Sequence, residues 1–284
     1  MLKRMKRSII KVDSLTKILV LSFCFVTTCF AVNNDGKRII AIGPSVNSIV
    51  REIGVSSEIV GVDTQSTDMY SKKIADVGYM RAISLEGLLS LKPNICITTS
   101  DVAPRNAIDA LSKYKVKTVV TNKIETPNSV YNNIMLVGDA LGYKDKAAHL
   151  KNKVMQQTNI ALKSIPVGKK VNALFLLQLS SSSVFILGNG THGDWWLKLV
   201  KINNISNLNG MKPLSREGFI ASKPDMIIIA KINDSLQFPF QDDLNKYVKN
   251  KDIKVVNVKS DILEGFGAEF GDNVKYLVNK VYYE

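Results

Sequence analysis

The sequence predicts an α/β fold made of two Rossmann-like lobes with parallel central sheets, joined by a single long helix. Three observations favour this fold. Short apolar runs alternate with helical patterns, one sequence segment returns later in the chain, and a stretch without glycine or proline lies between the two copies. We expect a ligand cleft between the lobes, because small molecules bind preferentially at domain interfaces.

The first lobe is expected over residues 37–141. Helical patterns at 104–114 and 129–141 lie among short runs rich in β-branched and apolar residues. Because strands and helices alternate, we expect parallel strands with helices covering the faces of the sheet. The predicted strands are 38–43, 59–63, 94–99 and 117–121.

The linking helix is expected over residues 142–166. Its central segment, 144–164, is rich in Lys, Ala, Gln, Leu and Met, and it contains no glycine or proline. The second lobe then follows over 167–284 and ends in a helix predicted at 270–282. Its predicted strands are 171–178, 184–187, 226–230 and 254–258.

An internal repeat is the most informative feature of the chain. Five residues of one segment recur in the second lobe at a constant spacing, and apolar positions match as well. Each copy predicts a short helix that begins near a serine, then a Lys-Pro turn, then a buried strand. The identical pairs are Ser84 and Ser215, Glu86 and Glu217, Gly87 and Gly218, Lys92 and Lys223, and Pro93 and Pro224.

The N-terminus predicts export. A basic stretch precedes an uncharged apolar run over residues 18–31, and this run is shorter than the about 20 residues that span a bilayer. A secretory signal over residues 1–31, cleaved after Ala31, is therefore expected, with a periplasmic mature protein. Lipid attachment at Cys29 and an uncleaved membrane anchor are the alternatives.

The net charge of the chain is +13, and its basic leader accounts for only part of it. The excess on the remaining chain suits an anionic ligand or a membrane surface. We do not expect nucleic acid as a partner, because the charge is scattered and no recognised nucleic-acid-binding motif is present.

The segment from Gly61 to Pro93 resembles the haem-binding proteins of bacterial haem ABC importers. These belong to a helix-linked class of substrate-binding proteins that also serves cobalamin and siderophores. The resemblance covers the whole mature chain, and Val77-Gly78-Tyr79-Met80-Arg81 is the part specific to the haem branch. It implies a monomer without enzymatic activity that captures haem in the periplasm and delivers it to an ABC permease dimer in the inner membrane.

The resemblance implies that Tyr79 is the axial ligand of the haem iron and that Arg81 hydrogen-bonds the ligating oxygen. The chemistry is reasonable independently. Free tyrosine has a pKa of about 10, and both ferric iron and a nearby guanidinium favour the phenolate. In an extended segment, residues two apart lie on one side. The alternative is a tyrosine packed in a loop beside a solvated arginine, and Tyr70 is a further candidate at the cleft rim.

The second lobe offers other candidate contacts with haem. Some relatives place a histidine just after the first strand of this lobe, whereas residues 179–183 contain leucine and serines only, which leaves the sixth iron position unassigned. His192 is expected either to face the cleft or to precede a helix capped by Asp194. Trp195, Trp196 and Phe266 are candidates for apolar contact with the porphyrin, and packing in the core is the alternative for each.

Residues 265–269 resemble a family loop that borders the pocket, but Ala268-Glu269 stands where the family has Pro-Arg, so an arginine for a propionate is missing there. In the wider class, one glutamate per lobe docks into arginine pockets of the permease. Glu86 and Glu217 match that pattern, while the local alternative is that each complements the dipole of its helix.

Two other functions stay open at this point. A ferric-siderophore or corrinoid site on the same fold would use Tyr79 for stacking. An enzyme on a two-lobed α/β scaffold, such as a nucleotide-sugar transferase, is disfavoured. The chain lacks a Walker phosphate loop, a serine nucleophile elbow and a cluster of metal-ligating residues.

Overall fold

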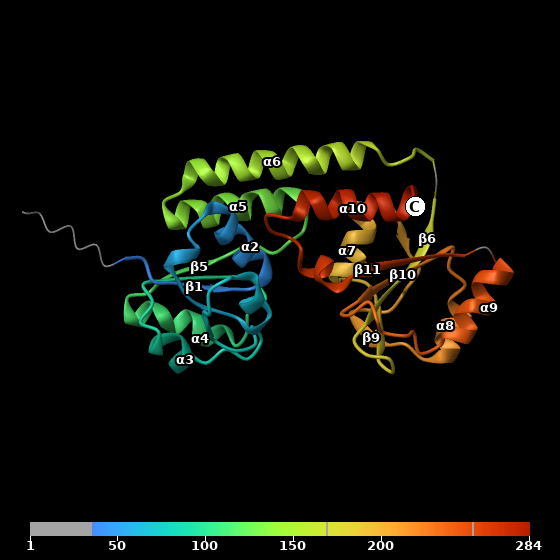
Figure 1. Cartoon of the computed structure of the whole chain (residues 1–284), viewed down its shortest axis with the longest axis horizontal. Helices are drawn as coiled ribbons and strands as arrows, with labels where there is room; N and C mark the ends of the chain where they lie inside the picture. Colours follow the sequence, from blue (N-terminus) through green and yellow to red (C-terminus); the bar gives the residue numbers. More distant parts are fainter. Residues whose placement is uncertain (1–35, 169, 252) are drawn as a thin grey trace, which may run out of the picture. The chain divides into compact units, whose positions relative to one another are not determined.

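Two β-sheets with helices packed around them form the computed structural model of the chain, which describes residues 36–284 except 169 and 252 (Figure 1). Residues 37–284 make up one compact unit. The predicted leader over residues 1–31, with Cys29 and Ala31, lies outside the described residues. Within the described part of the chain, no helix combines the length and the apolar character needed to cross a membrane.

The first sheet is parallel throughout and has the order β3-β2-β1-β4-β5. All four predicted strands form, and the short exposed β3 is an addition that no apolar run signalled. The strand order reverses between β1 and β4, so their carboxyl ends open a crevice in which ligands bind in such sheets. The strands are β1 (Ile39–Ile42), β2 (Ile59–Val62), β3 (Ala75–Asp76), β4 (Ile95–Thr98) and β5 (Lys117–Val120).

Helices cover the first sheet largely where the sequence predicts them. The predicted helix 104–114 is divided into an α-helix and a 3-10 turn. The helix predicted from 129 begins two residues earlier, because Pro127 suits its first turn and Thr126 and Ser129 cap each other's backbone. The elements are α2 (Pro44–Ile53), α3 (Leu85–Ser90), α4 (Arg105–Ala110), α5 (Pro127–Leu141), η1 (Ser56–Glu58), η2 (Thr64–Met69) and η3 (Leu111–Tyr114).

The long helix α6 (Lys144–Lys163) has the bounds expected from composition. It packs against α5 and against α10 (Phe270–Tyr282), so it lies beside helices of both halves of the chain (Figure 1). Gly138 of α5 permits this closeness, because a Cβ there would lie 2.1 Å from the Cβ of Ala147. Its buried face recurs at helical spacing: Ala147, Leu150, Val154, Thr158 and Ala161.

The second sheet is mixed rather than purely parallel. Strands β6, β10 and β11 are parallel to one another, but β7 runs antiparallel to both of its neighbours, β6 and β9. The short serine-rich turn that joins β6 to β7 can only connect antiparallel neighbours. The sheet has the order β11-β10-β6-β7-β9, with β8 beside β6. The strands are β6 (Asn172–Gln178), β7 (Val184–Leu187), β8 (Asn203–Asn204), β9 (Met211–Pro213), β10 (Met226–Lys231) and β11 (Lys254–Lys259).

The internal repeat has the local structure that the sequence predicts. The side chains of Ser84 and Ser215 cap α3 and α8 (Arg216–Ser222), each accepting a hydrogen bond from the backbone N–H of the glycine three residues on. Lys92 and Lys223 both adopt left-handed backbone conformations before their prolines. The two copies are therefore structurally equivalent. The remaining elements are α7 (His192–Leu199), α9 (Gln241–Lys251) and η4 (Ser260–Glu264).

One hydrophobic core runs through both halves of the chain. It joins buried residues of β1 and α2 to those of β6, α7 and α10, with α5 and α6 between them. Smaller cores cover the opposite faces of the first and second sheets. The two lobes are thus connected by a shared layer of helices as well as by the chain itself.

Candidate functional site

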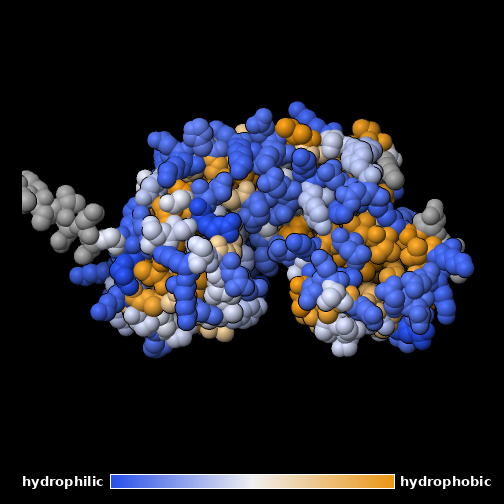
Figure 2. Space-filling model, viewed as in Figure 1, coloured by the Kyte–Doolittle hydropathy of each residue, from blue (hydrophilic) through white to orange (hydrophobic). Residues whose placement is uncertain are grey.

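A cavity of about 410 Å³ lies where the two lobes face each other, and Figure 2 shows the molecule hollowed at this place. The first lobe contributes the residues that follow β1, β4 and β5, at the carboxyl ends of parallel strands. The second lobe contributes the first turns of α7 and the loop that follows η4. Its position matches the predicted cleft between the lobes.

Aromatic side chains form the second-lobe wall. Trp195 lies edge-on to Phe266 with ring centroids 5.0 Å apart, and His192 lies edge-on to the same ring at 4.8 Å. Trp196 stacks behind Phe266 at 5.2 Å and is fully buried. Trp195 and Phe266 therefore line the cavity and belong to the core at once, which makes this wall rigid.

His192 begins α7 and is held by an acid. Its Nδ1 lies 3.6 Å from Oε1 of Glu264, and both residues line the cavity. Burial lowers the pKa of His192, but the hydrogen bond and charge of Glu264 and the charge of Asp101 outweigh it, so the pKa is raised overall. The imidazole thus gains positive charge more readily than in water.

The predicted helix cap at Asp194 is wrong. Thr191 caps α7 by accepting the N–H of Asp194, because the helix starts three residues earlier than the prediction requires. Asp194 is instead a buried acceptor, 3 % exposed at its side chain, which receives the backbone N–H of Gly190 and the ammonium of Lys198 at 2.7 Å. Burial opposes the ionised form, yet these bonds lower the pKa of Asp194.

Tyr79 stands on an exposed turn that Arg81 connects to the cavity-lining Asp101. Gly78 has a left-handed backbone (φ 98°), which turns the chain so that the Tyr79 side chain is 49 % exposed. The extended segment expected here is not formed, because the N–H of Ala82 bonds the carbonyl of Tyr79 at 2.7 Å and closes a turn. Arg81 bonds Asp101 at 3.0 Å, and Asp101 lines the cavity although Tyr79 and Arg81 do not.

The Gly61-Val62-Asp63 motif is connected to the start of this turn by hydrogen bonds. Asp63 is fully buried, and one carboxylate oxygen accepts hydrogen bonds from the Gly43 N–H at 2.7 Å and from the Ser66 hydroxyl at 2.7 Å. Burial raises the pKa of Asp63 despite these bonds. The next residue, Thr64, donates its N–H to the carbonyl of Gly78 at 3.1 Å, which ties the Asp63 network to the start of the Tyr79 turn.

Tyr70 faces away from the cavity. Its hydroxyl lies 2.8 Å from the side-chain oxygen of Asn47, and its ring helps to line a separate surface hollow with Arg51 and Lys72. Burial raises the pKa of Tyr70 above its usual range. The structure therefore does not bring Tyr70 together with His192, Trp195 and Phe266.

Comparison with known proteins identifies the fold. The family model described as periplasmic binding protein matches residues 39–252. The chain belongs to the periplasmic binding protein family. A curated relative, the uncharacterized ABC transporter substrate-binding lipoprotein YvrC of Bacillus subtilis, is 23% identical over 257 residues, which are 88% of this chain and 82% of the relative. Membership of this family places the chain among binding proteins rather than enzymes.

Solved structures agree with this fold. The apo form of the periplasmic haem-binding protein RhuT from Roseiflexus sp. RS-1 superposes with a TM-score of 0.72 at 20% identity, covering 87% of this chain and 98% of that one. The periplasmic haem-binding protein HutB of Vibrio cholerae gives a TM-score of 0.67 at 24% identity, covering 87% and 99%. At these identities the likeness establishes the two-lobed fold of this binding protein.

The two repeated glutamates of this periplasmic binding protein are both exposed in the first turns of α3 and α8. The Ser84 hydroxyl lies 2.9 Å from Oε2 of Glu86, and hydrogen bonding by the backbone N–H of Glu86 and then by Ser84 lowers the pKa of Glu86. Glu86 therefore stays ionised at neutral pH. Both helix-dipole stabilisation and a role in docking are compatible with this exposure.

Several residues that line the cavity of this binding protein were not singled out from the sequence. Asp101 and Lys123 follow strands, and Glu264 ends the short helix η4, elements that the sequence could not place beside the cleft. The signal that would have found the first two is the polar run directly after a buried strand, as in Thr99-Ser100-Asp101. This signal can be used only when the strand order is known, because that order decides which strand ends lie at or beside the reversal point.

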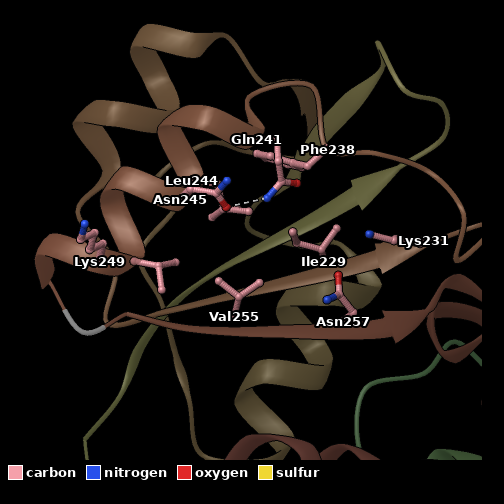
Figure 3. A pocket seen from close by; sticks show the side chains of 10 residues that line it. Ile229, Lys231, Phe238, Gln241, Leu244, Asn245, Lys249, Val255 and Asn257 are labelled. Carbon is pink, nitrogen blue, oxygen red and sulfur yellow. Dashed lines mark hydrogen bonds between the residues drawn. The ribbon is translucent and has the colours of Figure 1, made fainter.

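A second cavity, of about 340 Å³, lies within the second lobe between α9 and the strands β10 and β11 (Figure 3). Half of its lining residues are apolar, and three of these, Ile229, Phe238 and Leu244, belong to the core of that face of the sheet. Residues of the first lobe take no part in it. The cavity between the lobes is therefore the better candidate for the ligand site of this family member.

Proposed function

We propose that this binding protein captures ferric haem, with Tyr79 as the iron ligand, and delivers it to the permease of an ABC importer. Tyr79 is the observation that carries the proposal. Its phenol is exposed on the turn whose Arg81 pairs with the cavity-lining Asp101, and its hydroxyl makes no hydrogen bond within the described part of the chain. A phenolate is a known axial ligand of haem iron.

Arg81 is the expected partner of the ligating oxygen. It is bound to Asp101 through one nitrogen only, and its side chain is 52 % exposed, so it is free to turn toward Tyr79. A guanidinium beside the phenol favours the phenolate that binds ferric iron. Since Asp101 also lines the cavity, this ion pair connects the Tyr79 turn to the cavity wall.

The second-lobe wall supplies a surface suited to a porphyrin. Trp195 and Phe266 offer aromatic contact, and His192 offers an imidazole whose Nδ1 faces Glu264. Carboxylates commonly hold metal-ligating histidines in this way. We include His192, Trp195 and Phe266 in the proposed haem site and leave Tyr70 outside it, because Tyr70 bonds Asn47 on another face.

A spectroscopic titration tests the proposal. Mature protein titrated with ferric haem is expected to give a saturable Soret shift and a high-spin phenolate charge-transfer band. Tyr79→Phe is expected to lose the band, because phenylalanine cannot ligate iron. Tyr70→Phe is the matched control and is expected to keep it. Loss of the band in both variants, or in neither, would contradict ligation by Tyr79.

A ferric siderophore is the second candidate, favoured by the polarity of the first-lobe wall. Hydroxyl, amide and charged groups of residues 99–101 and 121–125 face the cavity, and such groups suit a polar iron chelate better than a porphyrin face. Trp195 and Trp196 are the only tryptophans of the chain, so their fluorescence reports occupancy of the cavity. Saturable quenching by ferric siderophores, without any response to haem, would favour this candidate.

Docking to the permease completes the proposed function. Glu86 and Glu217 are exposed at equivalent positions of the two lobes, as the repeat requires. Two equivalent carboxylates fit a permease of two subunits, each with a basic pocket. We therefore propose that these glutamates present the loaded protein to the permease.

A further inference from the structure

The charges that line the cavity are distributed unequally between the two lobes. On the second-lobe wall each cationic group is already paired: Lys198 bonds the buried carboxylate of Asp194 at 2.7 Å, and His192 faces Glu264. Asp194 is 3 % exposed, so its charge depends on Lys198 for compensation. The second-lobe wall therefore has little positive charge to offer a ligand.

Lys123 differs from the other two cationic groups. It is exposed, it lines the cavity, and it makes no ion pair among the described residues. It follows β5, so it lies at the carboxyl end of a strand next to β4. Thr99, Ser100 and Thr121, each of which carries a hydroxyl group, line the same wall.

Thr99 adds a polar group without a partner. Its Oγ1 is buried and finds no hydrogen-bond partner in the described part of the chain, although the residue lines the cavity. A buried hydroxyl without a partner is costly. A rotation about χ1 that turned this oxygen to a ligand would remove that cost. The wall around Lys123 thus combines one uncompensated cation with hydroxyl donors, which is the chemistry that recognises a carboxylate.

We propose that Lys123, with the hydroxyls of Thr99, Ser100 and Thr121, binds a carboxylate group of the ligand and makes the first lobe selective for acidic ligands. This inference rests on the proposed function, in which the carboxylate is a propionate of haem. In this arrangement the first lobe holds the propionate, which compensates for the arginine that is missing from the second-lobe loop at 268–269.

Glu125 is the nearest opposing charge in the sequence. It also lines the cavity and is exposed, and it makes no ion pair among the residues described. Its carboxylate would repel a propionate that approaches Lys123. Neutralising Lys123 and neutralising Glu125 should therefore change the selectivity in opposite directions, which a general effect on folding would not do.

The test compares ferric haem with haem dimethyl ester, in which both propionates are esterified and uncharged. Dissociation constants are measured by Soret titration for wild type, Lys123→Gln, Glu125→Gln and the control Lys275→Gln. The control removes the same charge from an exposed position on α10 outside the cavity. Wild type is expected to prefer haem over the ester by about threefold or more, the scale of one partly exposed ion pair.

Lys123→Gln is expected to abolish this preference and Glu125→Gln to increase it, while Lys275→Gln keeps the wild-type ratio. The Tyr79 charge-transfer band should persist in all four proteins. Equal binding of haem and ester by wild type, with the band intact, would overturn the carboxylate site alone. No saturable change with either compound would overturn the proposed function, and the carboxylate site with it.

Discussion

Replacing Gly267 by alanine should weaken the contact between the two lobes where the second-lobe loop packs on α2. A Cβ at Gly267 would lie 1.9 Å from the Ser48 hydroxyl oxygen and 2.5 Å from the backbone carbonyl oxygen of Ser45. The hydroxyl can rotate away, but the carbonyl belongs to the start of a buried helix and cannot. The same loop depends on a hydrogen bond from the Ala268 N–H to the Ser48 hydroxyl at 3.0 Å.

The cost of Gly267→Ala has two parts. Overpacking at a tight site costs about 1–3 kcal/mol and a lost hydrogen bond about 1 kcal/mol, so the free energy of unfolding should fall by about 2–4 kcal/mol. Urea unfolding followed by tryptophan fluorescence measures this, because Trp195 and Trp196 both contact Phe266 in the same loop.

Two further variants show whether the backbone contact is the cause. Ser48→Ala in the Gly267→Ala background removes the nearer contact but leaves the Ser45 carbonyl, so most of the loss should remain. Gly87→Ala is the control, because the nearest atom to its Cβ would be 3.7 Å away and alanine is the better helix former. A Gly267→Ala protein within about 0.5 kcal/mol of wild type would refute this account of the lobe contact.

Two more predictions concern charge. Because the pKa of His192 is raised in the folded protein, its contribution to stability is fully present below the unfolded pKa of about 6.5 and is lost as pH rises through the folded value. The urea midpoint of wild type should therefore fall over this window relative to His192→Gln, and parallel pH profiles would contradict the Glu264 contact. Glu86→Gln and Glu217→Gln should leave ligand affinity within twofold of wild type, roughly the scatter of exposed substitutions. Each should reduce stimulation of the permease ATPase in proteoliposomes, and full stimulation by the double variant would exclude docking through these residues.

The strands and the repeat could be predicted because their structure depends on residues close together in the sequence. The interior strands of a parallel sheet are apolar along their whole length, so β1 and β10 read as continuous apolar runs. In both copies of the repeat the serine caps its helix, and the lysine adopts a left-handed turn before the proline. Caps and turns that depend on neighbouring residues can therefore be predicted from short segments of the sequence.

The contacts of the site could not be predicted in the same way. Arg81 bonds Asp101, which is twenty residues away and reaches the turn only because α3 and β4 bring it back. The prediction that Arg81 lies beside Tyr79 assumed an extended segment, and a single backbone bond from Ala82 to Tyr79 replaced it by a turn. Tyr70 similarly bonds Asn47, a partner that no spacing in the sequence indicates.

The construction of the lobe boundary indicates how the ligand is captured. Opening the cavity by a hinge would have to break the contacts of Tyr131 with Phe270, Gln157 with Asp272 and Ser48 with Ala268, and would divide a shared core. Cores resist such division, because buried apolar area is lost with every contact. The groups that are free to move are instead exposed side chains, those of Tyr79 and Arg81 on their turn and of Lys123 in the cavity wall. We therefore expect ligand binding to reorient these side chains while the two sheets stay in place, which hydrogen exchange of β1 and β6 with and without ligand would measure as unchanged protection.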